Sequence, residues 1–237
     1  MATMTLEELV SQLRAAYGEA LQAVVLYGSA AAGEHIPKRS DYNVLVIAQS
    51  LTAERLRAAA AVGSAWSASG SPPPMTLTTE EWRGSSDIFA MEYADILERH
   101  KVLYGSPPFD DVTVARSDLR LQVEREAMGK LLQFRQGVLA AGNDPKRQLQ
   151  LLEASLSTLM VVFRGVSRLS GDSPPADNEA LAASVAAKGG FDAAPFTRVV
   201  RHVRGTDKLP TRDVESLIGG YLEGLQRLVA YVDRLAV

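Results

Sequence analysis

A glycine and a serine follow one apolar run early in the chain, and an acidic residue precedes the next run. Residues 24–27 have the length and composition of a buried strand, which ends at Gly28 and Ser29. Asp41 stands shortly before a second run, residues 44–47, which is rich in β-branched side chains. A glycine at this turn lets a phosphate approach the backbone, and the serine can donate to it. An acidic residue on the neighbouring strand is suited to hold a divalent cation against that phosphate.

This stretch resembles the signature of the polymerase-β-type nucleotidyltransferases. In that family a Gly-Ser pair, a further glycine and a Ser-Asp-x-Asp on the next strand form the active-site core. The resemblance implies transfer of a nucleoside monophosphate from an ATP-like NTP to a hydroxyl group with magnesium. It also implies that Asp41 is catalytic and binds the metal, and that the other matching residues bind the nucleotide. The matching positions are Gly28, Ser29, Gly33, Ser40 and Asp41.

The set of carboxylates in this signature is incomplete. Two carboxylates two residues apart on a strand face the same side and can bind the same metals. The second family aspartate is replaced by Asn43, whose amide offers one neutral oxygen ligand. A third carboxylate is expected on the strand 75–78, but the nearest acids, Glu80 and Glu81, fall after it on a predicted helix. We therefore predict a weak magnesium site at Asp41 and Asn43 that depends on the phosphates of the NTP.

Several charged side chains near the signature each have two interpretations. Glu92 and Asp95 are three residues apart and would share a helical face, either supplying a missing carboxylate or lying on a surface helix. Lys38 and Arg39, in the loop before the acidic residue, are candidate contacts for the triphosphate or stay solvated. His35 in the same loop is predicted to be exposed rather than catalytic.

Other aromatic and basic residues are better explained by structure than by chemistry. Trp66, Trp82 and Tyr93 are candidates for stacking on a base, but their spacing favours the core. Arg198 and His202 are four apart on a predicted helix. This spacing is too short for the Arg-x4-6-His nuclease signature of HEPN-type bundles, so we predict a solvated face.

The composition limits the kinds of partner. Apolar residues at 46% and charged residues at 22% are typical of a globular protein, and a net charge of -3 gives no electrostatic basis for binding nucleic acid. Cysteine is absent, which fits a cytoplasmic location, and the three histidines are widely spaced, which disfavours a histidine metal site. Without a run of about 18 apolar residues, we expect no membrane span.

The elements that position the signature form an α+β fold of two domains. Residues 1–110 predict a small mixed β-sheet nucleotidyltransferase domain flanked by helices, and residues 111–237 predict an all-α antiparallel bundle. Residues 156–163 are apolar nearly all round, which predicts the central helix of the bundle. Predicted strands cover 23–27, 42–48, 75–78 and 101–104, and predicted helices cover 5–19, 52–67, 117–141, 145–169, 178–188, 194–203 and 211–235. A further helix is predicted to open at Thr78 and continue through Trp82, and the ambiguous segment 86–105 favours a short helix before its strand.

Two functions of different classes remain open from the sequence. The first is a nucleotidyltransferase acting on an unidentified small-molecule or protein acceptor. The second is a catalytically silent protein of the same fold that binds a nucleotide or a protein partner. Asn43 and the missing third carboxylate support this second function. An antitoxin-like role is a third interpretation, which the attached bundle disfavours. A homodimer formed through an apolar face of the bundle also remains open.

Overall fold

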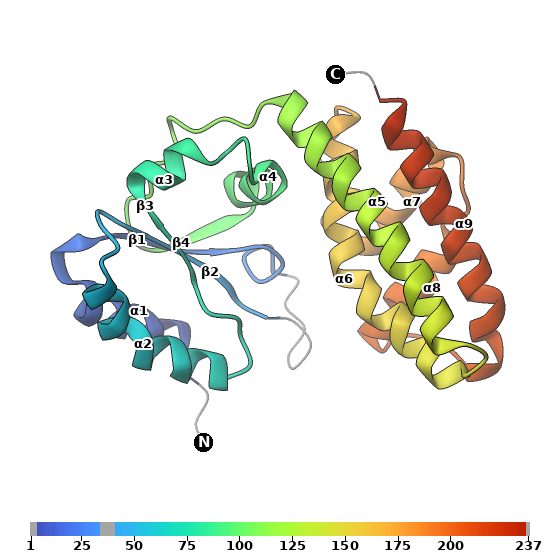
Figure 1. The fold of residues 1–237 in the computed structure, drawn as a ribbon, viewed down its shortest axis with the longest axis horizontal. Helices are drawn as coiled ribbons and strands as arrows, with labels where there is room; N and C mark the ends of the chain where they lie inside the picture. The colour runs from blue at the N-terminus through green and yellow to red at the C-terminus, as the bar shows by residue number, and fades with distance from the viewer. Residues whose placement is uncertain (1–3, 34–40, 236–237) are drawn as a thin grey trace. The chain divides into compact units, whose positions relative to one another are not determined.

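The chain folds into two compact units, Met1–Val114 and Ala115–Val237 (Figure 1). The computed structural model describes residues 4–33 and 41–235. The first unit combines a sheet with helices and the second is helical, which confirms the predicted fold class. The division lies a little beyond the boundary drawn from the sequence after residue 110. The reason is Val112, which is buried in the cluster on one face of the sheet.

The described part of the first unit contains a four-stranded mixed sheet in the order β3-β2-β1-β4. β1 is antiparallel to both β2 and β4, whereas β2 and β3 are parallel. The predicted strand 75–78 is confirmed at both ends, and the other three differ by one or two residues. The strands are β1 Leu21–Tyr27, β2 Asn43–Ala48, β3 Met75–Thr78 and β4 His100–Gly105.

Helices cover both faces of the sheet (Figure 1). α1 (Leu6–Tyr17) and α2 (Ala53–Ala68) pack on one face, and α3 (Thr79–Gly84) and α4 (Ala90–Glu98) on the other. Because strand side chains alternate, Val24 and Val44 enter the first core and Val25 and Leu45 the second.

The three aromatic residues that the sequence assigned to the core are buried. Trp66, on α2, is 1% exposed in the core between the sheet and the helices α1 and α2. Trp82 and Tyr93 are 0% and 1% exposed on the other side of the sheet. The rings of Trp82 and Tyr93 stack with centroids 4.1 Å apart. The indole N–H of Trp82 donates to the carbonyl of Pro108 at 3.0 Å. These side chains therefore fix the sheet and its helices and are not available to stack on a base.

Five helices and a short 3-10 turn build the described part of the second unit. Asp144 caps α6, which begins at Pro145 as the predicted range 145–169 has it. The last predicted helix, 211–235, is divided, because residues 211–213 form a 3-10 turn, a common start for a helix. The helices are α5 Arg116–Ala141, α6 Pro145–Leu169, α7 Asn178–Gly189, α8 Ala194–Arg204 and α9 Val214–Asp233.

α6 is the central helix of this unit, as its apolar middle predicts. Leu152, Leu159 and Phe163 are at most 1% exposed and pack among the other helices. α6 is also long and apolar enough, by length and composition alone, to cross a membrane, which the sequence reasoning did not anticipate. Half of its most apolar window is buried inside the protein, as is usual for a core helix.

Arg198 and His202 have structural partners instead of forming a solvated face. Arg198 forms an ion pair with Asp213 at 3.1 Å. The imidazole of His202 lies 3.0 Å from the Glu153 carboxylate and accepts the N–H of Leu209 at 3.0 Å. The prediction of a solvated face is therefore wrong for His202, whose side chain is 13% exposed, because its partners lie far away in sequence.

Candidate nucleotide site

The turn after β1 lies against the first residue of β2. Tyr27 and Asn43 are paired in the antiparallel register, and Gly28 follows at φ +75°, a conformation that favours glycine. A Cβ atom at Gly28 would lie 3.2 Å from the amide nitrogen of Asn43. The N–H of Gly28 donates to the carbonyl of Arg99 at 3.3 Å, and its carbonyl accepts from the N–H of Ala32 at 3.2 Å. Glycine thus brings the turn backbone and the Asn43 amide together.

The face on which Asn43 lies follows from its neighbours in β2. Tyr42 packs toward α1 and α2, where its ring centroid is 6.1 Å from that of Trp66. Leu45 packs on the opposite face, under α3 and α4. Since side chains alternate along a strand, Asn43 shares the α4 side with Leu45. Asp41, two residues before Asn43, is exposed at the entrance to β2.

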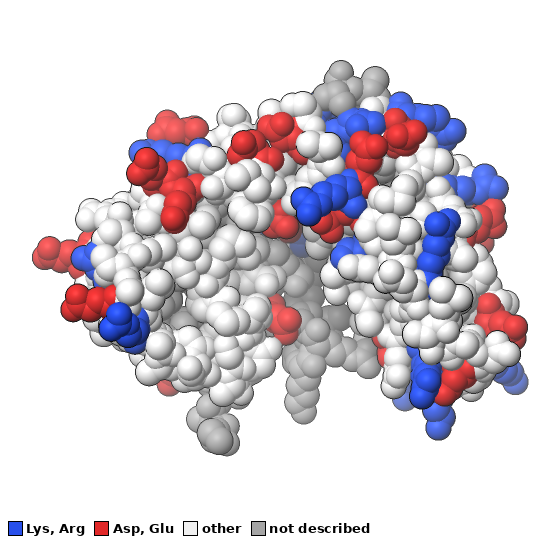
Figure 2. Space-filling view, viewed as in Figure 1, with Lys and Arg blue, Asp and Glu red and all other residues white. Residues whose placement is uncertain are grey.

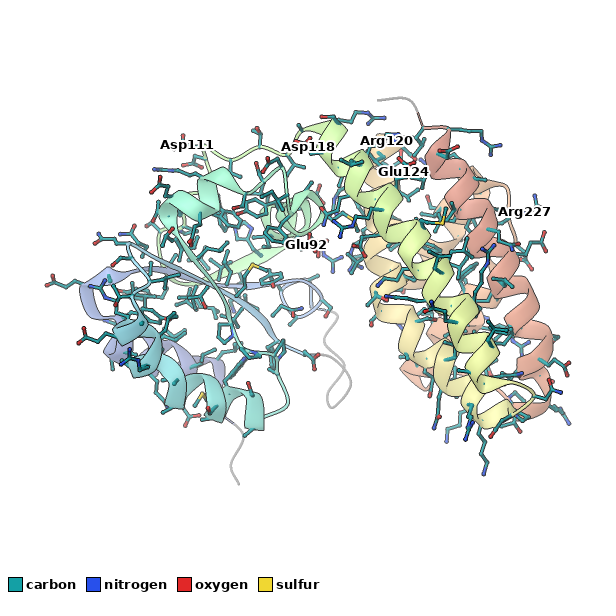
Figure 3. All side chains as sticks on the ribbon, viewed as in Figure 1. Glu92, Asp111, Asp118, Arg120, Glu124 and Arg227 are labelled. Carbon is teal, nitrogen blue, oxygen red and sulfur yellow. The ribbon has the colours of Figure 1, made fainter. Side chains whose placement is uncertain are left out.

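Two carboxylates on α4 approach the same end of the sheet. Burial, and then the charges of Glu92 and Asp95, raise the pKa of the Tyr27 hydroxyl to about 12. Glu92 is half-buried and Asp95 is 8% exposed (Figure 3 labels Glu92 on α4). Tyr27 directly precedes Gly28 in the sequence, so both acids act on the residue that begins the turn. The interpretation of these acids as a surface pair is therefore wrong for Asp95.

The raised pKa of Tyr27 predicts a loss of stability at alkaline pH. The unfolded chain releases this proton near pH 10 and the folded chain near 12, so the stabilisation is complete below pH 10 and is lost as the pH rises toward 12. Tyr27→Phe should therefore flatten the decline of the free energy of unfolding over this range, measured by urea denaturation.

A second substitution separates the contribution of the charges to the raised pKa of Tyr27 from that of burial. Glu92→Gln removes one cause of the raised pKa and should flatten the same decline in part. It should have no such effect in the Tyr27→Phe background, which makes the double variant a control. An equal decline in wild type and Tyr27→Phe would show that Tyr27 does not titrate as described.

The predicted site residues fall into two groups. Gly28, Ser29 and Gly33 lie in the turn after β1, and Asp41 and Asn43 lie at the start of β2. Three further predicted nucleotide contacts lie outside the described residues: Lys38, Arg39 and Ser40. His35 lies outside them as well. Their assignment, like that of the whole set, stays a prediction.

The residues around the turn also include members that the sequence did not single out. Tyr27 was read only as the last residue of a strand, although its place directly before the Gly-Ser pair was a usable signal. Glu80 and Glu81 lie on α3, as predicted, and the side chain of Glu81 accepts the N–H of Thr78 in a capping box. Glu81 therefore has a structural role.

The donor set suits one magnesium ion carried by phosphates and does not suit two. Asp41 offers a carboxylate and Asn43 a neutral carbonyl oxygen at the start of the same strand. In the part of the chain that the structure describes, no group of three or more His, Cys, Asp or Glu side chains could hold a metal. Magnesium usually binds through one or two carboxylates together with substrate phosphates, so this pair fits such an ion only with a nucleotide present.

Charge is mixed on the surface shown in Figure 2. Acidic and basic side chains are interspersed over the described residues of each unit on that face, as expected from a net charge of -3. This face therefore has no electrostatic character suited to a nucleic acid backbone.

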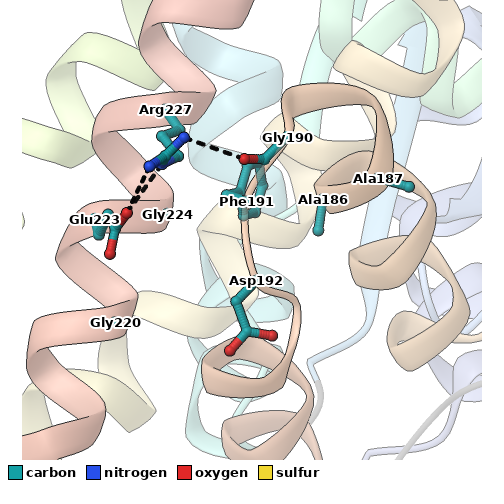
Figure 4. A pocket seen from close by; sticks show the side chains of 9 residues that line it. All are labelled: Ala186, Ala187, Gly190, Phe191, Asp192, Gly220, Glu223, Gly224 and Arg227. Atoms are coloured by element: carbon teal, nitrogen blue, oxygen red, sulfur yellow. Dashed lines mark hydrogen bonds and ion pairs between the residues drawn. The ribbon is translucent and has the colours of Figure 1, made fainter.

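The helical unit contains cavities of its own. One, of about 370 Å³, lies between the end of α7 and α9 (Figure 4). There the Arg227 guanidinium donates to Glu223 at 3.0 Å and to the carbonyl of Gly190 at 3.3 Å. A second, of about 260 Å³, is lined by residues such as Phe134, Ser155 and Tyr221. Neither contains a predicted site residue.

Comparison with known proteins shows the fold. No family model matches the chain, and no curated protein matches it. Among solved structures it is similar to spectinomycin adenyltransferase AAD(9) from Enterococcus faecialis, crystallised with ATP and spectinomycin. The TM-score is 0.58 and the sequence identity is 14%, over 93% of this chain and 96% of that chain. The chain therefore has the fold of AAD(9), a polymerase-β-type nucleotidyltransferase with a C-terminal helical domain.

Proposed function

We propose that the chain transfers the nucleoside monophosphate of an NTP, in the first instance ATP, to a hydroxyl group of a small molecule. The observation that carries this proposal is the contact between the Gly28 turn and Asn43, beside Asp41. It supports the proposal because the turn backbone, which would bind phosphate, and the Asp41 carboxylate, which would bind the metal, belong to the same end of the sheet. The likeness to an adenyltransferase crystallised with ATP and spectinomycin supports the same conclusion.

In the proposed reaction the acceptor hydroxyl oxygen attacks the α-phosphorus of the NTP. A new P–O bond forms while the bond to the bridging oxygen breaks, and pyrophosphate leaves with the electron pair. Ser29 would donate to phosphate oxygens through its N–H and hydroxyl. Magnesium, when bound by Asp41 and Asn43, would neutralise phosphate charge. Glu92, which lies close enough to raise the pKa of Tyr27, is the candidate to accept the hydroxyl proton.

The remaining predicted contacts belong to the same proposal. Lys38 would bind the triphosphate tail as a point charge and Arg39 through its planar guanidinium, and Gly33 and Ser40 would contribute further contacts to the nucleotide. Gly33 and Ser40 keep the roles that the sequence resemblance implies, whereas the roles of Lys38 and Arg39 follow from their place in the loop before Asp41.

A second candidate function is a nucleotide-binding module without catalysis. The observation that favours it is Asn43, which takes the place of a charged metal ligand in the family signature. Such a protein would bind ATP without dependence on magnesium, because the turn backbone would do most of the binding.

The test is a calorimetric titration of ATP with and without magnesium, followed by an assay with α-labelled ATP and spectinomycin as the first acceptor. If the chain is an enzyme, ATP binding should depend on magnesium. The Kd for ATP should then be at least about 10-fold lower with magnesium than without it. Equal Kd values with and without magnesium would favour the binding module. Absence of ATP binding under both conditions would contradict both proposals and leave protein partners as the alternative.

A further inference from the structure

α5 carries two apolar faces, although a helix on the surface of a bundle needs only one. Its inner face packs against α6 and α9. Four of its large apolar residues are exposed: Leu121 by 68%, Met128 by 43%, Leu132 by 48% and Leu139 by 83%. The inner face consists of Leu119, Val123, Ala127, Leu131, Phe134 and Ala141.

The four exposed side chains form one stripe. At about 100° of rotation per residue, Leu121, Met128, Leu132 and Leu139 fall within about 40° of arc around the helix. They extend over about 27 Å of its length. Figure 2 shows uncharged surface along this part of α5, with both basic and acidic side chains at its margins. An apolar stripe of this kind, with a polar rim, is typical of a protein interface.

The stripe is symmetric about position 130. Leu121 and Leu139 lie at equal distances on either side of that position, and so do Met128 and Leu132. A second copy of the helix running in the opposite direction would therefore place Leu121 opposite Leu139 and Met128 opposite Leu132. This match is a requirement of an antiparallel pair with two-fold symmetry, in which one patch contacts itself.

We propose that α5 pairs with α5 of a second copy of this chain, antiparallel, about a two-fold axis level with position 130. Opposed helix dipoles favour this direction. The charged residues on either side of the apolar stripe are also compatible with an antiparallel pair. Arg135 and Glu124 lie on the same side of the stripe, and in an antiparallel pair the same flanks of both helices meet. Arg135 would then face Glu124 of the second copy.

Glu124 also has a partner within its own helix, so Arg135 of the second copy would be a second cation beside its carboxylate. Arg120 forms an ion pair with it at 2.5 Å, one helical turn earlier (Figure 3). On the other flank, Arg125 would face Gln136 of the second copy, so that no like charges meet. The apolar stripe thus forms the centre of the proposed interface, and the charged side chains form its rim.

The mass of the protein in solution tests the proposal. Sedimentation equilibrium of the wild type should give twice the 25.5 kDa of the chain, and the double variant Met128→Glu, Leu132→Glu should give 25.5 kDa. Ile88→Glu is the matched control, because Ile88 is 63% exposed outside α5 and its replacement should leave the dimer intact. A wild type of 25.5 kDa at every concentration would overturn the proposal, as would a control that dissociates like the double variant.

Introduced cysteines test the direction of the helices without depending on charged variants. The chain contains no cysteine, so Leu121→Cys and Leu139→Cys each add a single thiol. When the two variants are mixed and oxidised, a disulfide-linked dimer should form, whereas neither alone should be linked. Linking of Leu121→Cys to itself would show a parallel pair and overturn the antiparallel arrangement.

Discussion

Replacing Asp41 by asparagine should lower the rate of nucleotidyl transfer about 100-fold or more, because it removes the charged side chain proposed to bind the metal at the start of β2. Asparagine keeps the shape of the side chain and an oxygen that can bind a metal, but it cannot balance the charge of a magnesium ion. Since Asp41 is exposed and precedes the strand, the free energy of unfolding should change by only about 0.5 kcal/mol.

The measurement for Asp41→Asn is the initial rate of transfer from α-labelled ATP, with urea denaturation of the same samples. Asp110→Asn is a matched control, because Asp110 is an exposed acid of the first unit that is not one of the proposed site residues. Its transfer rate should equal that of the wild type. Equal rates for Asp41→Asn and the wild type would remove Asp41 from the proposed reaction.

The elements of this fold are predictable where local sequence decides them. Thr5 with Glu8 and Thr78 with Glu81 form capping boxes that fix the first residues of α1 and α3. The side chain of Asp144 accepts two backbone N–H groups at the start of α6. Each signal depends on residues within one helical turn, so no knowledge of the tertiary structure is needed to use it.

Apolar periodicity predicts that a side chain is packed against something, but it does not identify the partner. Met128 and Leu132 have the same character as Leu131 and belong to the same helix, yet only Leu131 is buried in the described structure. Two apolar faces on one helix give a weak period in the sequence, because their residues together cover most of its circumference. Their assignment to the inner or outer face needed the positions of α6 and α9.

The contact between the Gly28 turn and Asn43 was predictable from the sequence, whereas the position of the α4 carboxylates was not. The pairing of the Gly28 turn with Asn43 follows from two successive strands, which the sequence already indicated. The approach of Glu92 and Asp95 to Tyr27 depends on how α4 packs across the sheet. The sequence between residues 86 and 105 was ambiguous between helix and strand, so it could not place these carboxylates.

A substitution at Asn43 can distinguish the two proposed functions, because the side-chain amide lies next to the Gly28 turn. An aspartate at this position would lie within the same surroundings as Tyr27, near the negative charges on α4. Without a cation those charges would repel one another, and the variant should be less stable than the wild type. With a metal–nucleotide complex bound, the added carboxylate would become a second charged ligand.

Asn43→Asp should therefore lower the Kd for ATP in the presence of magnesium about 10-fold or more, and should raise the rate of transfer. The same variant should unfold at lower urea concentration than the wild type in the presence of a chelator, and should regain that stability with magnesium and ATP. Asn43→Ser is the control, because it changes the side chain without adding charge and should show no gain in affinity. If Asn43→Asp and Asn43→Ser bind ATP equally with magnesium, position 43 does not contact the metal. The neutral residue would then be a feature of the turn, and the binding module would account for the site better than an enzyme weakened by one substitution.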